Sequence, residues 1–396
     1  MRNETHLKRR LGPVLMTGYG VGVMVGAGIY VLVGAVAAQS GIWAPLAFAL
    51  AGLIATPSAL SYAELSSRIP EAAGEAAYVE AGLDSRALGV LVGLAIVAAG
   101  TISAAAVLRG GAGYLTLLLP LPNEVVMVVL GLALIGVACL GVLESVGFAA
   151  VLTLIEVCGL ALVIWAGFSV APSPDLTPLP APYWPGIAMA ASLAFFAFIG
   201  FEDMVNMSEE MRDPTRDMPR AILGALAITT VLYLGVSWAA VRAVPLAELS
   251  ASEQPLALVW QAAGHGPQLL AAIAVAAALN GVLAQVVMAA RVLYGLGRRT
   301  PALSVFHAAH PRFGTPVLAT VLSGAGMIAL ALSAPIEQLA GASAIVLLGV
   351  FLLVNLALIV LKRRSAFAPF RVPMAVPVLG ASVAGAALIA ALGGFA

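Results

Sequence analysis

The chain is a series of long apolar stretches separated by short polar connections. A helix that crosses about 30 Å of hydrocarbon needs about 20 apolar residues, and eleven stretches reach that length. Transmembrane strands would instead alternate in polarity over about 10 residues, and the chain shows no such alternation. The pattern predicts an all-α, polytopic membrane helix bundle with helices at about residues 12–38, 42–62, 87–108, 124–143, 146–170, 185–207, 220–243, 267–296, 315–333, 336–361 and 372–394.

The composition narrows the class of protein further. Of the 396 residues, 62% are hydrophobic and 10% are charged, whereas a soluble domain carries about 25% charged residues. The 19 basic and 19 acidic residues cancel, so the chain lacks the basic excess of a nucleic-acid-binding protein. Its two cysteines indicate neither a disulfide framework nor a metal site. We therefore expect one transmembrane domain over residues 1–396, with a lipid bilayer and a small molecule as partners.

The basic residues predict how the bundle lies in the membrane. The first stretch follows a basic start, but its apolar length exceeds the roughly 7–15 residues of a signal-peptide core, so we expect it to remain as a helix. Cytoplasmic connections are rich in Lys and Arg. With the N-terminus inside, only Arg109 and Arg242 of the 19 basic residues lie near the outer side. The prediction is a multi-pass protein of the cytoplasmic membrane, with its N-terminus inside and, after eleven crossings, its C-terminus outside.

The first apolar stretch contains five glycines within eleven residues, from Gly18 to Gly28. Glycine costs about 1 kcal/mol relative to alanine inside a helix, and Gly26 and Gly28 bracket the expected point of unwinding. Small residues also let two helices pack closely. The glycines alone therefore leave open an interrupted helix and a close-packing face.

The sixth apolar stretch favours the interrupted helix. It carries Gly200 at about mid-depth, followed by two adjacent acids. Two interrupted helices at matching positions in the two halves of a chain indicate a transporter binding site. We therefore predict an inverted repeat of five plus five helices, with repeats at about 12–170 and 185–361 and an extra helix at about 372–394.

The chemistry of such interruptions predicts the ligand. Unwinding exposes backbone N–H groups at the start of one half-helix and C=O groups at the end of the other. The N–H end is partially positive and suits a carboxylate, while the C=O end suits an ammonium group. Non-helical backbone at membrane depth is tolerated where it lines a cavity or is buried in protein. An α-amino acid, with both charges close together, fits both ends at once.

Several motifs follow one another in the order and at the spacing of a known family. They are Gly26–Tyr30, Tyr62–Leu65, Pro70 with Gly74–Tyr78, Phe198–Glu202, Glu209–Pro214, Pro219–Ile222, Asn280–Gly281 and Arg291–Pro301. At these residues the sequence resembles the amino acid–polyamine–organocation (APC) superfamily of permeases over nearly the whole chain. The resemblance implies a leucine-transporter-like fold of two inverted five-helix repeats, usually with twelve helices in all. This chain stops after eleven predicted helices, which leaves both a monomer and a homodimer open.

The resemblance also implies which residues bind substrate. Backbone N–H groups at the first interruption would bind the carboxylate, and carbonyl groups at the second would bind the ammonium. Phe196 matches an aromatic lid over the substrate, and Asn280 either lines the pocket or forms an interhelical hydrogen bond. The predicted substrate-binding residues are Val25, Gly26, Ala27, Gly28, Ile29, Phe196, Phe198, Ile199, Gly200 and Asn280.

Four phenylalanines surround the second interruption, and their alternative role is packing. We expect at least two of them to face lipid, and therefore to take no part in a pocket. The four are Phe195, Phe196, Phe198 and Phe201.

Glu156 lies centrally in the fifth apolar stretch. A carboxylate at mid-membrane costs about 2.5–3.5 kcal/mol on insertion scales, so such a residue is a functional candidate. Many members of the resembled family carry a lysine here, thought to replace a bound sodium ion. We interpret Glu156 as the group that carries or senses a coupling proton; the alternative is a structural carboxyl bonded to the unwound first helix. Related sodium sites use hydroxyl residues on the eighth helix, and residues 271–291 contain none, which speaks against sodium coupling.

Three further acids lie near the expected inner surface. Glu202, and with less weight Asp203, is predicted to act in gating or protonation. The alternative is a solvated helix end or a pair with a cytoplasmic arginine. Glu64 lies near Arg68, and we expect an ion pair that closes the inner vestibule.

These observations predict a secondary active transporter that moves an α-amino acid by alternating access. Proton coupling is favoured, and exchange is the alternative. A neutral substrate is favoured over a cationic amino acid or polyamine, which would be recognised through Glu156 or Glu202. A membrane-embedded enzyme would need a clustered nucleophile, base or metal-ligand set, and a channel would need a selectivity ring. Neither pattern is visible, so we expect no enzyme activity and no cofactor besides the proton.

Overall fold

A computed structural model describes residues 11–26, 28–70, 74–140, 146–178, 180–365 and 367–394. Regular structure in these ranges is helical, apart from an isolated bridge between Leu11 and Met211. The longer helices are α1 (Pro13–Val25), α2 (Gly28–Ser40), α3 (Ala44–Arg68), α5 (Arg86–Leu115), α6 (Asn123–Leu140), α7 (Val146–Ser169), α8 (Trp184–Phe195), α9 (Pro214–Ala243), α12 (Gln268–Arg299), α13 (Val317–Ser333), α14 (Ile336–Arg364) and α15 (Ala375–Gly394). The shorter ones are η1 (Gly41–Trp43), α4 (Gly74–Leu83), η3 (Pro174–Leu176), η4 (Phe196–Phe198), η5 (Asp203–Glu210), α10 (Leu246–Ala251), α11 (Pro255–Ala262) and η6 (Pro301–Phe306).

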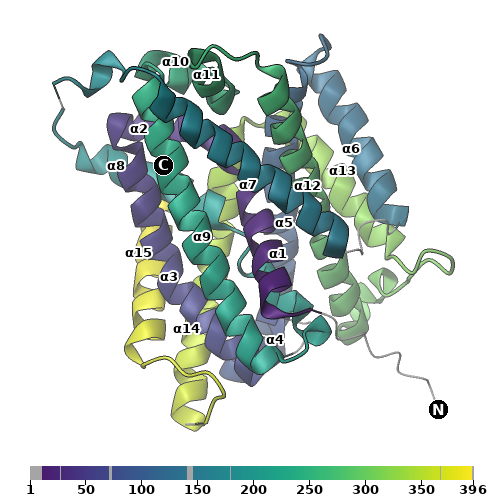
Figure 1. Cartoon of the computed structure of the whole chain (residues 1–396). Helices are drawn as coiled ribbons and strands as arrows, with labels where there is room; N and C mark the ends of the chain where they lie inside the picture. The colour runs from purple at the N-terminus through teal and green to yellow at the C-terminus, as the bar shows by residue number, and fades with distance from the viewer. Residues whose placement is uncertain are drawn as a thin grey trace.

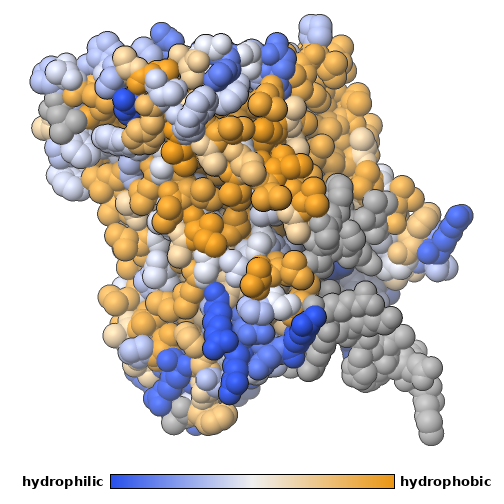
Figure 2. Space-filling view, viewed as in Figure 1, coloured by the Kyte–Doolittle hydropathy of each residue, from blue (hydrophilic) through white to orange (hydrophobic). Residues whose placement is uncertain are grey.

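The described residues contain nine stretches long and apolar enough to cross a membrane, and α1 and α13 are shorter apolar helices. Each predicted segment coincides with helical structure, the first with α1 plus α2 and the sixth with α8 and the turns after it. Figure 2 shows, on the face in view, a hydrophobic band across the middle and hydrophilic residues gathered toward both ends. The polytopic all-α bundle is therefore confirmed, while the eleven crossings and the inverted repeat remain predictions.

The helices are packed closely because many contacts are made by small residues. In Figure 1, α1 begins at the end of the bundle that carries α4, here called the α4 end, and α10 and α11 cover the opposite, α10 end. α5 and α12 form an extensive pair. At their contact, a methyl group on Gly111 would overlap with the side chain of Ala278. Such backbone approach through small residues is how membrane helices associate.

A buried ionic cluster ties three parts of the chain together at the α4 end. Glu64 of α3 binds Arg68 at 2.6 Å and Lys362 of α14 at 2.6 Å. It also accepts a hydrogen bond from the N–H of Val372, just before α15, at 2.8 Å. Glu64 is fully buried and Lys362 is 7% exposed. The predicted Glu64–Arg68 pair is confirmed, and the further contacts show that it joins α3 and α14 to the connection before α15.

We expect Glu64→Ala to lower the free energy of unfolding by about 3–5 kcal/mol, because Lys362 and Arg68 would then be buried without their counter-charge. Denaturant unfolding of the detergent-solubilised protein measures this change. Asp217→Ala is the control, since its partner Arg220 is 72% exposed and lies 3.7 Å away; a surface pair of this kind contributes about 0–1 kcal/mol. Equal, small losses in the two variants would contradict a structural role for the cluster.

Candidate functional site

Two interruptions of helical structure meet in the interior of the bundle. α1 ends at Val25, and α2 begins at Gly28. Between them Gly26 has φ 16° and ψ −153°, outside the helical region. The second interruption follows Phe195, the last residue of α8, where the chain continues as the turn η4 and then becomes extended. Both interruptions lie where the glycine pattern indicated.

Glycines allow the two interruptions to lie directly against each other. Gly200 has φ +127°, a conformation that residues with a Cβ disfavour. A Cβ there would lie 2.8 Å from Cγ1 of Val23 and 3.2 Å from N of Met24, both on α1. On the other side, a Cβ on Gly28 would lie 3.4 Å from Cα of Ala197 in η4. The backbones of the two interruptions are therefore in close contact at Gly200 and at Gly28.

The hydroxyl of Tyr233 on α9 joins the two interruptions. It lies 2.6 Å from the carbonyl oxygen of Met24 and 2.7 Å from that of Ala197. A tyrosine hydroxyl carries a single hydrogen, so it donates to one of these carbonyls at a time. The ring packs edge-on against Phe48 and Phe198 and is fully buried. One side chain thus holds the end of α1 and the end of α8 in register.

A small cavity lies between the two interruptions. Its volume is about 20 Å³, which is space for about one water molecule. Four of the predicted substrate-binding residues, Gly26, Gly28, Phe196 and Ile199, line it, and the described lining includes no charged side chain. The full lining is Val23, Met24, Gly26, Gly28, Ser103, Val107, Phe196, Ile199, Gly281 and Gln285.

The cavity is flanked by helix ends of opposite polarity. α2 begins at Gly28, and the first-turn N–H groups of a helix have no partner within it and carry partial positive charge. At the second interruption α8 ends, and the last carbonyl groups of a helix carry partial negative charge; the carbonyl of Ala197, just beyond that end, contacts Tyr233. Ser103 and Gln285 add a hydroxyl and an amide. The arrangement can bind a carboxylate on one side and an ammonium group on the other.

The other predicted binding residues that the structure describes lie near this cavity without lining it. Val25 and Ile29 are fully buried on either side of the first interruption. Phe198 packs its ring against Tyr233. Ala27 lies outside the residues that the structure describes. The predicted set is therefore brought together in one region, but only part of it faces the cavity.

The expectation that at least two phenylalanines face lipid is wrong. Phe195, Phe196, Phe198 and Phe201 are exposed by 1%, 5%, 0% and 0%. Phe195 and Phe201 contact Phe351 of α14, and α2, α3 and α15 also pack against α8. The rings are buried because the interrupted end of α8 is enclosed by other helices, which a single apolar stretch does not reveal.

Glu156 lies in α7, fully buried. Its Oε1 accepts a hydrogen bond from Asn280 of α12 at 2.9 Å, and its Oε2 has no hydrogen-bond partner in the part of the chain that is described. Its backbone carbonyl accepts a hydrogen bond from Tyr30 of α2 at 2.9 Å. Among the described residues, the side-chain partner is thus Asn280 and not the backbone of the first interruption. Asn280 therefore has the interhelical role of the two predicted for it.

Glu202 and Asp203 are also buried, at 1% and 3% exposure. Oε2 of Glu202 accepts a hydrogen bond from the N–H of Gly200 at 2.9 Å and so stabilises the second interruption. Oδ2 of Asp203 accepts one from Nε2 of Gln285 at 2.8 Å. The alternative of a solvated helix end is therefore wrong for both acids, because each is enclosed and hydrogen-bonded within the bundle.

Sequence reasoning missed Tyr233 and Gln285. A tyrosine within an apolar stretch has no pattern that distinguishes it from an ordinary core residue, and its two carbonyl partners are remote in sequence. Gln285 did carry a signal, because a buried amide without a partner is costly and such a residue in an apolar helix needs an explanation. Its partners, Asp203 and the cavity, emerge only from the packing of α12 against the interruptions.

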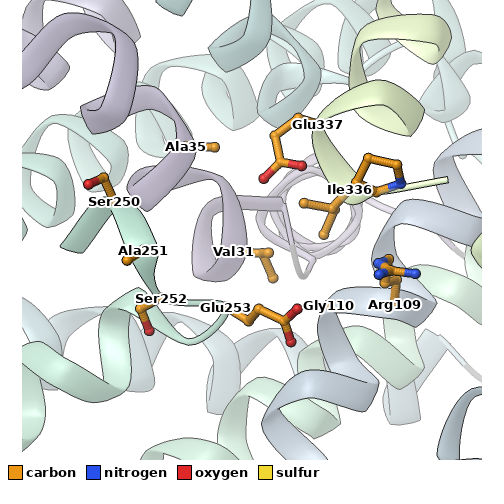
Figure 3. Close-up of a pocket in the computed structure, with 11 residues that line it drawn as sticks. Val31, Ala35, Arg109, Gly110, Ser250, Ala251, Ser252, Glu253, Ile336 and Glu337 are labelled. Atoms are coloured by element: carbon orange, nitrogen blue, oxygen red, sulfur yellow. The ribbon is translucent and has the colours of Figure 1, made fainter. Parts of the chain in front are cut away.

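A second cavity of about 130 Å³ lies on the α10 side of the first, between α2, α5, the start of α14 and the connection from α10 to α11. Figure 3 shows Arg109, Glu253 and Glu337 around it. Arg109 also donates a hydrogen bond to the carbonyl of Ala331 at 2.9 Å. Val31, three residues after Gly28 in α2, lines this cavity too, so α2 connects the two.

Comparison with known proteins finds one family over almost the whole chain. Residues 11–395 match the family described as amino acid permease. A branched-chain amino acid permease of Bacillus subtilis is 28% identical over 95% of this chain and 86% of its own. A methylthioribose transporter of the same organism is 29% identical over 95% and 87%. The vacuolar cationic amino acid transporter 2 of Arabidopsis thaliana is 31% identical over 90% of this chain and 60% of its own.

We expect Tyr233→Phe to lower the free energy of unfolding by about 1–3 kcal/mol, because a buried carbonyl loses its hydrogen-bond partner while the ring contacts stay. Denaturant unfolding measures the change. Tyr183→Phe removes the same atom from a side chain that is 67% exposed, and it should change stability by less than about 0.5 kcal/mol. Equal values for the two variants would show that the hydroxyl does not hold the interruptions together.

Proposed function

This chain belongs to the amino acid permease family, and we propose on that premise that it is a secondary active transporter of an α-amino acid that works by alternating access. Family membership and the apolar helices make it a multi-pass membrane transporter rather than an enzyme. The observation that carries the proposal is the pair of interruptions pressed together around one cavity. At this cavity, the start of α2 and the end of α8 offer opposite partial charges to a zwitterion.

In the proposed binding mode the substrate carboxylate accepts hydrogen bonds from N–H groups at Gly26 and Gly28, with Ala27 between them in the sequence. The N–H of Gly26 donates to the carbonyl of Gly22 at 3.1 Å in this structure, so it must leave that bond to take part. The ammonium group donates to carbonyls of Phe198, Ile199 and Gly200. The backbone supplies these groups without a charged side chain, so binding needs no counter-ion inside the membrane. Phe196, which lines the cavity, covers the substrate side chain.

The size of the central cavity supports the proposal of alternating access. A volume of about 20 Å³ is too small for an amino acid, since it is space for about one water molecule. The two interruptions must therefore separate to admit substrate. The hydroxyl of Tyr233 has one hydrogen, which it donates to the carbonyl of either Met24 or Ala197. Separating the two interruptions therefore breaks at most one hydrogen bond of Tyr233. The larger cavity at the α10 end then serves as the entry on that side.

A neutral substrate is favoured by the chemistry of the lining. The described lining of the central cavity is apolar apart from Ser103, Gln285 and backbone. Glu156 and Glu202, which would recognise a cationic side chain, are engaged by Asn280 and by the N–H of Gly200. Similarity to a branched-chain amino acid permease supports a neutral, apolar amino acid. Similarity to a cationic amino acid transporter keeps a cationic amino acid or polyamine as the second candidate.

We assign energy coupling to protons, with Glu156 as the candidate coupling carboxyl and Glu202 as the gating one. Oε2 of Glu156 is free of hydrogen bonds within the described chain, so it can take up a proton without losing a partner. Exchange of one amino acid for another is the alternative. The distribution of Lys and Arg supports a cytoplasmic-membrane location with the N-terminus, and hence the α4 end, inside.

We expect Gly28→Val to reduce amino acid uptake into proteoliposomes at least tenfold, because the added methyl groups would fill the cavity beside Ala197 and Phe196. A panel of labelled L-amino acids, with and without an inward proton gradient, is the assay. Gly136→Val is the matched control, since a Cβ on Gly136 of α6 meets nothing within 4 Å, and it should transport normally. Normal uptake by Gly28→Val would overturn the proposed site.

The coupling assignment has its own test. Glu156→Gln keeps the shape of the side chain and an acceptor for Asn280 but cannot exchange a proton. We expect its uptake to lose the stimulation by an inward proton gradient, while exchange into vesicles preloaded with amino acid continues. A wild-type response to the gradient in this variant would contradict the coupling role and leave Glu156 as a structural residue.

A further inference from the structure

The short helix α4 (Gly74–Leu83) closes the α4 end of the bundle beside the second interruption. It packs against α5, α14 and η5. Gly74 has φ +45°, and a Cβ there would lie 2.5 Å from Oδ1 of Asn206 in η5. Because its backbone is pressed onto η5, the next residue, Glu75, points into the protein and is 2% exposed.

Within the residues that the structure describes, Glu75 is an acid without a basic partner. Its Oε1 has no hydrogen-bond partner within the described chain. Glu75 interacts electrostatically with three ionisable groups. They are Asp203 and Glu202 at the start of η5 and Tyr62 of α3. Tyr62 packs in turn against Tyr78 of α4. A buried acid surrounded in this way by other acidic groups favours its neutral form.

The described basic side chains near α4 on the neighbouring helices α3, α5 and α14 either bind another acid or are exposed to solvent. Arg68 of α3 and Lys362 of α14 both bind Glu64. Arg86, at the start of α5, is exposed. In the part of the chain that is described, no basic side chain shifts the pKa of the Glu75 carboxyl. Its charge is therefore not neutralised by an ion pair.

Glu75 is linked to the central cavity by a line of polar groups. Gln285 lines that cavity and donates a hydrogen bond to Asp203 at 2.8 Å. Asp203 in turn interacts electrostatically with Glu75. The line thus runs from the space between the interruptions, through α12 and η5, to the first turn of α4. Its outer member is a carboxyl with one oxygen free to bind a proton.

The surroundings of Glu75 shift its pKa. Burial raises the pKa of Glu75 to about 8, its own backbone N–H lowers it, and the carboxyl of Asp203 raises it again. The group is therefore protonated below about pH 8 and ionises as the pH rises through that value. Its neutral form is the one compatible with close packing of α4 on η5.

We propose that Glu75 and Asp203 form a proton-binding pair at the α4 end of the bundle, distinct from Glu156. Loss of the proton from Glu75 to water leaves a carboxylate that is repelled by the charge of Asp203, and no base of the described residues offsets that repulsion. The repulsion favours separation of α4 and η5, which opens the polar line toward the cavity; proton uptake restores the packed form. Proton binding by the pair does not depend on transport, whereas its use in gating the cavity rests on the proposed function.

Infrared difference spectroscopy tests the pair directly, because the carbonyl stretch of a protonated carboxyl disappears on ionisation. The purified full-length protein is titrated from well below to well above pH 8. We expect wild type and the matched control Glu80→Gln, on the same helix, to lose a carboxyl band with a midpoint near pH 8. Glu75→Gln should lack that band. A wild-type protein without it, or a Glu75→Gln variant that retains it, would overturn the proposal.

Asp203→Asn provides a second test that needs no change at Glu75. Removing the neighbouring charge should move the Glu75 midpoint to a pH about one unit lower. An unchanged midpoint would show that the two carboxyls do not act as a pair. Because these readouts involve no substrate, they remain decisive even if the protein fails to transport any amino acid, so failure of the pair and failure of the proposed function are distinguishable.

The gating role is tested in proteoliposomes by varying pH on one side at a time. We expect uptake by wild type and Glu80→Gln to change as the pH on the α4 side passes through about 8. In Glu75→Gln this response should be absent, while exchange activity remains. A wild-type pH response in Glu75→Gln would confine Glu75 to a role in proton binding without gating and overturn that part of the proposal.

Discussion

Backbone groups that leave a helix inside a membrane must find partners within the protein, because hydrocarbon offers none. The two interruptions in this chain meet that constraint in different ways. The carbonyls of Met24 and Ala197 share the hydroxyl of Tyr233, and the N–H of Gly200 is bound by Glu202. The rest of the central architecture depends on these contacts, since they hold two irregular backbones against each other without filling the space between them.

The bundle contains buried acids of two contrasting kinds: those paired with basic side chains and those with an oxygen that has no hydrogen-bond partner in the described chain. At the α4 end, Glu64 is surrounded by Arg68, Lys362 and the N–H of Val372. Every charge there has a partner, so the cluster resists rearrangement and joins helices outside the interrupted pair. Glu156, near the centre, and Glu75, in the first turn of α4, each have an oxygen without a hydrogen-bond partner in the described chain. Carboxyls of this second kind can change protonation state at little structural cost, which suits them to a moving part.

The size of the central cavity connects packing to function. Glycines at 26, 28, 200 and 281 bring backbones so close that little space remains between them. A binding site made from backbone atoms can therefore be closed by small movements of the half-helices. It can also be opened without exposing a charged side chain to lipid. The same close packing explains why the phenylalanines near the second interruption are buried rather than lipid-facing.

The sequence by itself determined the all-α membrane bundle, the family and the positions of both interruptions. Apolar length, the glycines near residues 26 and 200 and the order of the motifs are local properties, and they can be read without knowing which helices touch. The tertiary structure decided which predicted residues face the cavity, that Asn280 binds Glu156, and that Tyr233 and Gln285 take part. It also packed α4, which carries Glu75, against η5, which begins at Asp203. These contacts join residues more than 80 positions apart, and only the packing of whole helices selects such pairs, because many side chains on each helix are chemically equivalent candidates.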